Sequence, residues 1–454
     1  MFEKKVLVAG AGKSGICAAE LLARNGAKVI LFDENDKLEA DKVYENFELC
    51  NNKENIEVHI GALTDEIIGQ IELMVISPGI PTDSAFALKV KEAGIAVWSE
   101  IELAYHYEKG VVAAITGTNG KTTTTTLVGE IMKAYNESTY VVGNIGIPYT
   151  KLADGTTDKS VTVAEISSFQ LETIDTFRPH VSAILNITPD HLDRHYTFDN
   201  YAQCKVDITK NQTKDDYAVL NYDDPETVKR ADKIGAKVVF FSRKERLDEG
   251  VYVDRDDILI RENDVVTKVL SLNDIKLLGT HNVENVLAAV AVTYYMGVPV
   301  DIIEKVCTEF QGVAHRIEYV RTVNDVKYYN DSKGTNPDAA IKAIKAMTTT
   351  TFLIGGGYDK HSEYDEWIEA FDAKVKYLVL IGQTAEQIAL CAKNHGFNNI
   401  VFMDTLEDAV EFCYRNAKPG DAVLLSPACA SWGMFKNYEQ RGDLFKECVR
   451  RLEE

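Results

Sequence analysis

A repeated pattern constrains the fold of this chain more than any other feature of its sequence. A short apolar run ends in a glycine-rich turn and leads into a helical stretch, first in KKVLVAGAGKSGICAAELLARNG and again from VVAAITGTNGKTTTT onward. After residue 312 the alternation resumes with strand-like runs such as KVKYLVLIG and DAVLLSP. Strands that alternate with helices in this way form parallel sheets covered by helices. We therefore predict an α/β fold throughout.

The length of the chain predicts more than one domain. At 454 residues it exceeds what a single hydrophobic core usually organises. New strand-and-glycine-loop units open at two points, so we predict domains at residues 1–98, 99–312 and 313–454. Within the middle domain, the alternating stretch GVYVDRDDILIRENDVVTKVLSL predicts a small antiparallel sheet.

The charge balance argues against one class of partner. Hydrophobic residues make up 45% and charged residues 26%, as in ordinary globular proteins. With 49 Lys plus Arg against 70 Asp plus Glu, the net charge of −21 does not suit a general nucleic-acid binder, which needs a basic face. No apolar run approaches the roughly 18 residues of a membrane span, and the first one is too short for a signal peptide. We expect small-molecule ligands, no nucleic-acid or membrane partner, and a cytoplasmic location.

The strongest chemical signal is the segment Gly117–Thr122, GTNGKT, between an apolar run and a helical stretch. A glycine loop before a helix lets backbone N–H groups approach phosphate closely. Lys121 would reach the β- and γ-phosphates, and the Thr122 hydroxyl would bind Mg²⁺. The first glycine of the usual phosphate-loop pattern is replaced near Thr116. The alternative is a plain strand–turn–helix junction with a solvated lysine.

A second glycine motif lies near the amino terminus. Gly10, Gly12 and Gly15 form G-x-G-x-x-G, and Asp33 ends the next strand-like run, as in dinucleotide-binding folds. The motif is compatible with NAD or FAD and equally with another diphosphate ligand. Ser77-Pro78-Gly79 follows a further apolar run, at the end of a strand where open α/β sheets bind ligands.

Three residues of the middle region are candidates for metal or charge chemistry. Glu165 ends the strand-like VTVAE, where a carboxylate can hold Mg²⁺ near a phosphate loop, and is otherwise a solvated strand-end residue. His191 lies in the polar loop ITPDHLDRH, a setting that favours a functional histidine over a core one. The helical pattern around Lys205 taken alone predicts a surface lysine.

The last third of the chain repeats the strand-then-polar-loop pattern. Residues 330–337, NDSKGTNP, offer many donors and a lysine, which suits a nucleotide or phosphate. The same loop can also cap the next helix through Asn336. Gly355-Gly356-Gly357 with Lys360, and residues 426–431, SPACAS, are further loops of this kind.

Eight segments spread over essentially the whole chain are recognisable together. They are GTNGKT at 117–122, GNIG at 143–146, EISSFQLE at 165–172, the ITPDHLDRH loop, HNVEN at 281–285, HR at 315–316, NDSKGTNPDA at 330–339 and SPACASWGMFKNYEQRGDLFK at 426–446. With these segments the chain resembles the Mur ligase family. The phosphate loop would fit any member, including folylpolyglutamate synthases, whereas SSFQLE and the SPACAS run resemble the branch that adds D-glutamate.

The resemblance implies a fold and a reaction. It implies a Rossmann-like amino-terminal domain that binds a UDP-linked substrate, a central P-loop-type ATPase domain, and a Rossmann-like carboxyl-terminal domain that binds an amino acid. ATP would phosphorylate the carboxylate of UDP-N-acetylmuramoyl-L-alanine, and D-glutamate would attack the acyl-phosphate to give a tetrahedral intermediate, a step of peptidoglycan synthesis. Two Mg²⁺ ions and a monomeric enzyme are expected. The alternative within this chemistry is a sibling ligase or folylpolyglutamate synthase that adds a different amino acid.

The resemblance also implies roles for individual residues. The catalytic residues would be Lys121, Lys205 and His191, and the metal ligands Thr122, Glu165, His191 and Lys205 as a carbamate. The ATP site would comprise Gly117, Thr118, Asn119, Gly120, Lys121, Thr122, Thr123, Asn282, Asn285, Arg316, Asp331 and Lys333. The UDP-substrate site would comprise Ser14, Asp33, Ser77, Gly79, Asn144 and His191. The D-glutamate site would comprise Thr335, Lys360, Ser431 and Tyr438.

Two other classes of function are compatible with parts of the sequence. A dinucleotide-dependent oxidoreductase would use GAGKSG and Asp33, but it leaves GTNGKT without a role. A non-catalytic nucleotide sensor would bind ATP without turnover, and it makes little use of His191 and Lys205.

Overall fold

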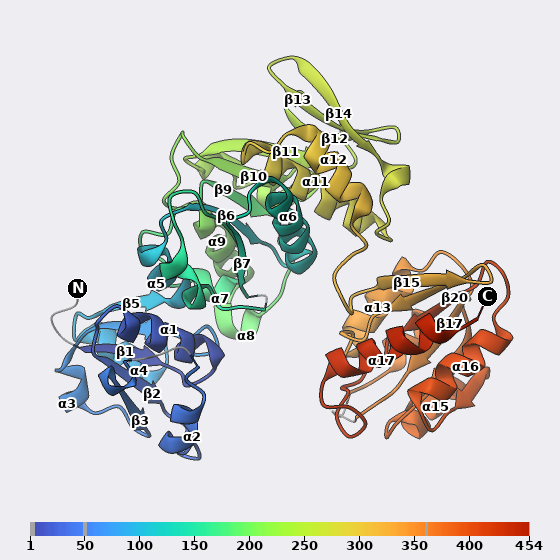
Figure 1. The fold of residues 1–454 in the computed structure, drawn as a ribbon, viewed down its shortest axis with the longest axis horizontal. Helices are drawn as coiled ribbons and strands as arrows, with labels where there is room; N and C mark the ends of the chain where they lie inside the picture. Colours follow the sequence, from blue (N-terminus) through green and yellow to red (C-terminus); the bar gives the residue numbers. More distant parts are fainter. Residues whose placement is uncertain (1–4, 49–51, 145, 359–361, 454) are drawn as a thin grey trace. The chain divides into compact units, whose positions relative to one another are not determined.

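The computed structural model describes residues 5–48, 52–144, 146–358 and 362–453. The chain divides into two compact units, one of Met1–Ile275 with Val283–Thr308 and the other of Lys276–Asn282 with Glu309–Glu454. The first unit holds two β-sheets and the second unit holds one. Figure 1 labels many of the strands and helices of both.

The first sheet is parallel, with strand order β3-β2-β1-β4-β5. Its order reverses between β1 and β4, and in such sheets ligands bind at this switch point, outside the carboxyl ends of the strands. The two loops that leave β1 and β4 there contain the Gly10–Gly15 motif and Ser77–Gly79. The elements are β1 (Lys5–Ala9), α1 (Lys13–Arg24), β2 (Val29–Asp33), α2 (Ala40–Glu45), β3 (Ile56–Ile60), α3 (Asp65–Ile68), β4 (Ile71–Ile76), α4 (Ala85–Glu92), β5 (Ala96–Ser99) and α5 (Glu100–Tyr107).

The second sheet has nine strands in the order β14-β13-β12-β11-β10-β9-β6-β8-β7. Neighbours from β7 to β12 are parallel, and β12 to β14 are antiparallel. The antiparallel strands predicted from the alternating stretch therefore continue the central sheet. The elements are β6 (Val111–Thr116), α6 (Lys121–Tyr135), β7 (Thr139–Gly143), β8 (Val161–Glu165), α7 (Ser168–Leu171), β9 (Val181–Ile184), α8 (Leu192–His195), α9 (Phe198–Val206), β10 (Tyr217–Asn221), α10 (Pro225–Val228), β11 (Lys237–Ser242), β12 (Gly250–Asp254), β13 (Asp257–Glu262), β14 (Val265–Ser271), α11 (Thr280–Tyr295) and α12 (Val300–Glu309).

The third sheet lies in the second unit, with strand order β15-β16-β20-β17-β18-β19. Only its edge pair, β15 and β16, is antiparallel. The elements are β15 (Glu318–Val323), β16 (Val326–Asn330), α13 (Pro337–Ala346), β17 (Thr351–Gly355), α14 (Asp365–Glu369), β18 (Val375–Leu380), α15 (Ala385–Asn394), β19 (Ile400–Phe402), α16 (Leu406–Asn416), β20 (Ala422–Leu425) and α17 (Tyr438–Arg451).

Helices cover both faces of the sheets, because successive strand residues point to opposite sides. In β20, Val423 and Leu424 belong to different hydrophobic clusters, and in β1 Leu7 and Val8 do so too. One large cluster joins α1 and α5 to the helices and strands of the central sheet, which explains why the first two sheets form a single unit. The predicted α/β fold class is confirmed. The domain boundaries at residues 98 and 312 stay a prediction.

None of the helices in the described part of the chain combines the length and the apolar content that crossing a bilayer requires.

Candidate active site

The phosphate-loop motif lies at the carboxyl end of β6 and leads directly into α6. Gly117 and Gly120 have φ angles of 152° and 87°, which residues with a side chain rarely adopt. A Cβ atom on Gly120 would lie 2.2 Å from Oδ1 of Asn285. The loop is therefore a tight turn packed against α11, and its shape depends on glycine.

Asn186 holds this loop in place from the neighbouring strand end. Its side chain accepts a hydrogen bond from the N–H of Asn119 at 2.8 Å and donates to the carbonyl of Asn119 at 3.1 Å. Its own carbonyl accepts from the N–H of Thr118 at 2.9 Å. The Thr118 hydroxyl in turn lies 3.0 Å from the hydroxyl of Tyr201. These contacts fix the backbone of the loop.

Two lysines converge on one carbonyl oxygen of the loop. Nζ of Lys121 donates to the carbonyl of Gly117 at 2.8 Å and to that of Thr118 at 3.0 Å. Nζ of Lys205, which comes from α9, donates to the same Gly117 oxygen at 2.9 Å. The structure thus brings together two of the three residues predicted to be catalytic.

Lys205 is buried, with only 2% of the residue exposed. Its Nζ lies 4.7 Å from the centre of the Tyr201 ring. Burial, followed by the nearby charge of Lys121, lowers the pKa of Lys205 to about 7. The surface location that the helical pattern predicted is wrong, because that face of α9 packs against the phosphate loop. An amine with such a pKa is unprotonated in about half of the molecules near pH 7, and in that form it can act as a nucleophile.

Glu165 ends β8 beside the loop and is almost fully buried. Its Oε1 accepts a hydrogen bond from Nδ2 of Asn144 at 2.8 Å. Its Oε2 is buried with no hydrogen-bond partner among the described residues. A buried carboxylate oxygen without a hydrogen-bond partner lowers the stability of the fold unless a bound ligand contacts it. Asn144 is predicted for the UDP-substrate site, and the structure places it against Glu165.

In the threonine run of residues 122–126, Thr122 and Thr126 are partly exposed, and Thr122 is the one beside the phosphate loop. Thr123–Thr125 are buried, whereas the side chain of Thr122 is partly exposed at the first turn of α6. Thr124 donates to Oδ1 of Asn285 at 3.3 Å, and this bond connects α6 to α11.

His191 and His195 lie at the two ends of the short helix α8 and differ in exposure. The His191 side chain is 49% exposed, 3.6 Å from Asp190, and its ring lies 4.9 Å from that of Phe169. His195 is buried and shares a 3.0 Å hydrogen bond with the hydroxyl of Ser168, and burial lowers its pKa. His191 is therefore the histidine that a ligand can reach.

Arg194 links the loop of His191 to the amino-terminal sheet. It donates to both carboxylate oxygens of Glu172, at 3.0 and 2.8 Å, and to the carbonyl of Ile80 at 2.8 Å. The Thr82 hydroxyl donates to the same Glu172 at 3.0 Å. Sequence analysis did not single out Arg194, although this residue belongs to the ITPDHLDRH loop.

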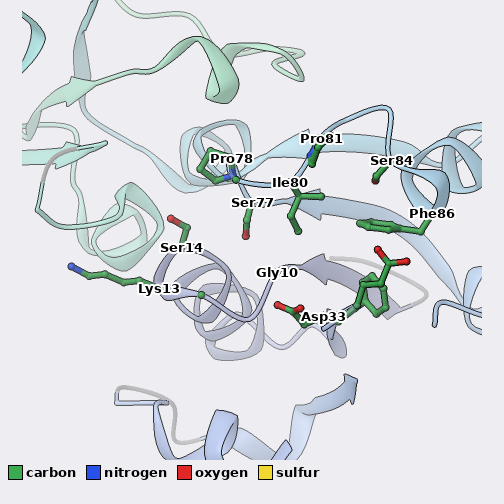
Figure 2. Close-up of a pocket in the computed structure, with 14 residues that line it drawn as sticks. Gly10, Lys13, Ser14, Asp33, Ser77, Pro78, Ile80, Pro81, Ser84 and Phe86 are labelled. Carbon is green, nitrogen blue, oxygen red and sulfur yellow. The ribbon is translucent and has the colours of Figure 1, made fainter. Parts of the chain in front are cut away.

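Four of the six residues predicted for the UDP-linked substrate surround a cavity of about 500 Å³ at the switch point of the first sheet, whereas Asn144 and His191 are not among its lining residues. Ser14, Asp33, Ser77 and Gly79 all line it. Figure 2 shows Ser14, Ser77 and Asp33 around this opening, with the ring of Phe86 at one side. Asp33 is held by the N–H of Ala11, which donates to its carboxylate at 2.9 Å.

Asp331 is a buried carboxyl of the second unit with a strongly shifted pKa. It follows β16, is 4% exposed, and accepts hydrogen bonds from the hydroxyl of Ser426 at 2.7 Å and the N–H of Ile317 at 3.2 Å. Burial raises the pKa of this carboxyl to about 7. Arg316, which is also predicted to bind ATP, is exposed. Its positive charge acts in the opposite direction and lowers the pKa of Asp331.

Arg441 joins the two long motifs of the second unit. It is fully buried in α17 and donates to the hydroxyl and carbonyl of Ser332, at 2.9 and 2.8 Å, and to the carbonyl of Cys429 at 3.1 Å. Burial lowers the pKa of its guanidinium to about 10. The sequence missed this residue, because an arginine in an amphipathic helix has the pattern of a surface residue.

Lys333 and Tyr438, which were predicted for different ligands, lie side by side. Nζ of Lys333 is 5.7 Å from the centre of the Tyr438 ring, and the Ser332 hydroxyl donates to the Tyr438 carbonyl at 2.8 Å. Ser431 is buried, and the N–H of Thr335 donates to the carbonyl of Lys333 at 2.8 Å. Lys360 lies outside the described residues.

The two asparagines of HNVEN belong to different units. Asn285 packs against the phosphate loop in the first unit, whereas Nδ2 of Asn282 donates to the carbonyl of Leu278 at 2.7 Å in the second. Their joint role in binding ATP stays a prediction.

Comparison with known proteins decides the family. Three family models match the chain: a Mur ligase MurD-like amino-terminal domain over residues 4–99, a Mur ligase middle domain over 115–293, and a Mur ligase glutamate ligase domain over 315–429. Curated UDP-N-acetylmuramoylalanine–D-glutamate ligases from Lachnoclostridium phytofermentans and Lachnospira eligens are 54% and 56% identical to it, with 99% of each chain covered. The chain belongs to the Mur ligase family.

Solved structures of Mur ligases share its fold. The MurF ligase from Thermotoga maritima in complex with ADP matches with a TM-score of 0.58 and 20% identity, covering 99% of this chain and 97% of that one. The UDP-N-acetylmuramate–alanine ligase MurC from the same organism gives a TM-score of 0.58 and 18% identity, with 99% of each chain covered. At this level of identity the likeness concerns the fold alone.

Family membership favours the ligase over the two other classes of function. An oxidoreductase would leave the phosphate loop and its two lysines without a role, and a sensor would have no need of the buried Lys205 amine. Sequence reasoning missed Asn186, Arg194 and Tyr201 of the first unit and Arg441 of the second. Asn186 carried a signal, since it directly follows the apolar run VSAIL, and the two arginines lie in segments that carry the family resemblance.

Proposed function

We propose that this Mur ligase uses ATP to join D-glutamate to UDP-N-acetylmuramoyl-L-alanine in peptidoglycan synthesis. The main structural support for an ATP-dependent reaction is that Lys121 and Lys205 converge on a tight glycine loop after β6. The relatives that are 54% and 56% identical over nearly the whole chain supply the substrates by their names. They favour D-glutamate over the alternative of a sibling ligase or a folate enzyme.

The chemistry explains why a phosphate loop is needed. A carboxylate is a poor electrophile, so one of its oxygens first attacks the γ-phosphorus of ATP, and ADP leaves. The amine of D-glutamate then attacks the carbonyl carbon of the acyl-phosphate and loses a proton, and phosphate leaves the tetrahedral intermediate. Lys121 and the loop N–H groups stabilise the negative charge on the transferring phosphoryl group. The remaining rate enhancement comes from holding the reacting groups in the correct orientation.

The residues beside the loop fit a magnesium ion. The unpaired Oε2 of Glu165 and the hydroxyl of Thr122 are hard oxygen donors, which Mg²⁺ prefers. When bound, Mg²⁺ would neutralise charge on the ATP phosphates. The exposed imidazole of His191 and a modified Lys205 are proposed to hold a second ion, which accords with the number of ions the resemblance implies.

Carbamylation of Lys205 is part of the proposal. A neutral amine attacks carbon dioxide and loses one proton, which turns a potential cation into an anion able to bind a metal. The burial of Lys205 and its pKa of about 7 support this reaction, because the amine must be unprotonated to attack. Lys205→Ala is expected to be nearly inactive and to regain part of its activity with a small added carboxylate. Full activity in that variant would remove Lys205 from the mechanism.

The UDP-linked substrate is proposed to bind at the amino-terminal cavity. Hydroxyls of Ser14 and Ser77 and the carboxylate of Asp33 suit a uridine diphosphate, whose phosphates and ribose need donors and an acceptor. Lys13 also lines this cavity, and its Nζ donates to the carbonyl of Gly146 at 2.5 Å. That contact ties the cavity to the segment that carries Asn144.

The second unit is proposed to supply the remaining contacts. Asp331, Lys333, Arg316 and Asn282 are assigned to the nucleotide. Thr335, Ser431, Tyr438 and Lys360 are assigned to the two carboxylates and the amine of D-glutamate, because hydroxyls and a lysine suit such a ligand. A monomeric enzyme acting in the cytoplasm remains part of the proposal.

Phosphate release tests the function directly. The full chain is incubated with ATP, Mg²⁺ and UDP-N-acetylmuramoyl-L-alanine, and D-glutamate, L-glutamate, L-lysine or meso-diaminopimelate is added in turn. Release that depends on D-glutamate is expected. Release with another amino acid would overturn the assigned specificity, and ATP binding without release would favour the sensor.

A further inference from the structure

Two neighbouring helices of the second unit bring three metal-binding side chains together. Asp365 is the first residue of α14, Cys391 lies in α15, and His395 caps the carboxyl end of α15. Their ligand atoms all lie within 4.8 Å of one another, and Nε2 of His395 is 2.8 Å from Oδ1 of Asp365. None of the three belongs to the candidate active site.

The spacing of the residues explains why they converge. Cys391 and His395 are four residues apart, so both side chains lie on the same face of α15. That face packs against α14, where Asp365 starts the helix. Asp365 and His395 are partly exposed, with 64% and 26% of their side chains accessible, so an ion can enter from solvent.

A second carboxylate lies near the other ring nitrogen of His395. Nδ1 of His395 lies 3.7 Å from a carboxylate oxygen of Glu369, one turn along α14 from Asp365. Histidines that bind metals are commonly held by a carboxylate behind the imidazole, which fixes the ring and makes the ligating nitrogen more basic. The two carboxylates also give the cluster a negative charge that attracts a cation.

We propose that Asp365, Cys391 and His395 bind a divalent transition-metal ion of the zinc type. A thiolate, an imidazole and a carboxylate together select zinc or cobalt over magnesium or calcium, which prefer oxygen ligands alone. Three protein ligands leave the fourth tetrahedral position to water. The ion ties α14 to α15 and stabilises the second unit.

Binding requires a small rearrangement and the loss of a proton. In a tetrahedral site the ligand atoms are roughly 3.3–3.7 Å apart, so the Asp365–His395 contact must open slightly. Burial and the carboxylate of Asp365 raise the pKa of the Cys391 thiol, so the thiol carries a proton before the ion binds. Each ion bound therefore releases a proton.

Cobalt serves as a spectroscopic probe for this site in the full chain. Co²⁺ is titrated into metal-free protein without ATP, and a near-ultraviolet sulfur-to-cobalt charge-transfer band is expected at one equivalent. Cobalt bound to oxygen ligands beside the phosphate loop gives no such band. Cys391→Ser is expected to abolish it, and His395→Gln to weaken the affinity roughly tenfold or more.

Cys448 provides a matched control. It lies in α17 near Glu407 and Glu447, and no metal-binding group among the described residues includes it, so Cys448→Ser is expected to leave the band unchanged. Zn²⁺ is also expected to raise the unfolding temperature of the wild-type chain and of Cys448→Ser but not of Cys391→Ser. Absence of the band in the wild-type chain, or its persistence in Cys391→Ser, would overturn the proposal.

Discussion

Replacing Lys205 by methionine is expected to stabilise the first compact unit while abolishing ligase activity. The lysine is buried, and its pKa falls from 10.5 to about 7. A shift of that size corresponds to roughly 5 kcal/mol of unfavourable free energy for keeping the charged form folded, at about 1.4 kcal/mol for each pH unit. Methionine has a similar length and no charge, so it avoids this cost.

The stability difference between the wild type and Lys205→Met is expected to depend on pH. Below about pH 7 both the folded and the unfolded states bind the lysine proton, and the full cost applies. Between about pH 7 and 10.5 only the unfolded state binds it, so the stability of the wild-type chain rises with pH by about 1.4 kcal/mol per unit. Above that range the cost disappears. The advantage of Lys205→Met is therefore largest below pH 7 and declines as the solution becomes alkaline.

Thermal unfolding of the first unit measures this difference. In buffer free of carbon dioxide, which prevents carbamylation, the methionine variant is expected to unfold roughly 5–10 °C above the wild type below pH 7. The two midpoints are expected to converge near about pH 10. Lys237→Met is the control, because Lys237 lies 5.2 Å from the centre of the Tyr217 ring but is exposed. A methionine variant that is less stable than the wild type below pH 7 would refute the reasoning.

Three further substitutions test other parts of the site. Glu165→Gln is expected to raise the Mg²⁺ concentration for half-maximal activity roughly tenfold or more, and an unchanged requirement would exclude Glu165 as a ligand. Gly120→Ala is expected to weaken ATP binding and to lower stability by roughly 1–3 kcal/mol. The reason is that Gly120 has a φ of 87° and a new Cβ there would clash with Asn285. Titration calorimetry with ATP measures the change in binding. Arg194→Gln removes the guanidinium that pairs with the carboxylate of Glu172, so it is expected to lower stability by roughly 2–4 kcal/mol. It is also expected to raise KM for the UDP-linked substrate more than it lowers kcat, and an unchanged KM would contradict the link between Arg194 and the amino-terminal sheet.

The sequence predicted the architecture well because strands and glycine loops are local features. The apolar runs that end at Ala9, Ile76 and Thr116 are strands, and the polar loops after them lie at the carboxyl ends of parallel sheets. The strand pairing could not be read from the sequence. The antiparallel strands after Gly250 extend the central sheet because β12 hydrogen-bonds to β11, a contact that no local pattern specifies.

The sequence was less informative about burial. Lys205 has the pattern of a surface residue, and only the packing of α9 against the phosphate loop makes its amine buried and its pKa low. Arg441 was missed for the same reason, since two of its three hydrogen bonds reach Ser332, which is far away in the chain. Whether a long polar side chain is buried depends on its tertiary neighbours, which helical periodicity does not describe.

Tracing an oxygen atom tests the central claim most directly. UDP-N-acetylmuramoyl-L-alanine is labelled with a heavy oxygen isotope in its terminal carboxylate and is converted with ATP, Mg²⁺ and D-glutamate. If the carboxylate is phosphorylated before the amine attacks, each phosphate released carries one labelled oxygen, which mass spectrometry detects. Unlabelled phosphate would mean that water attacked ATP, and activation of the substrate as an acyl-phosphate would then be contradicted.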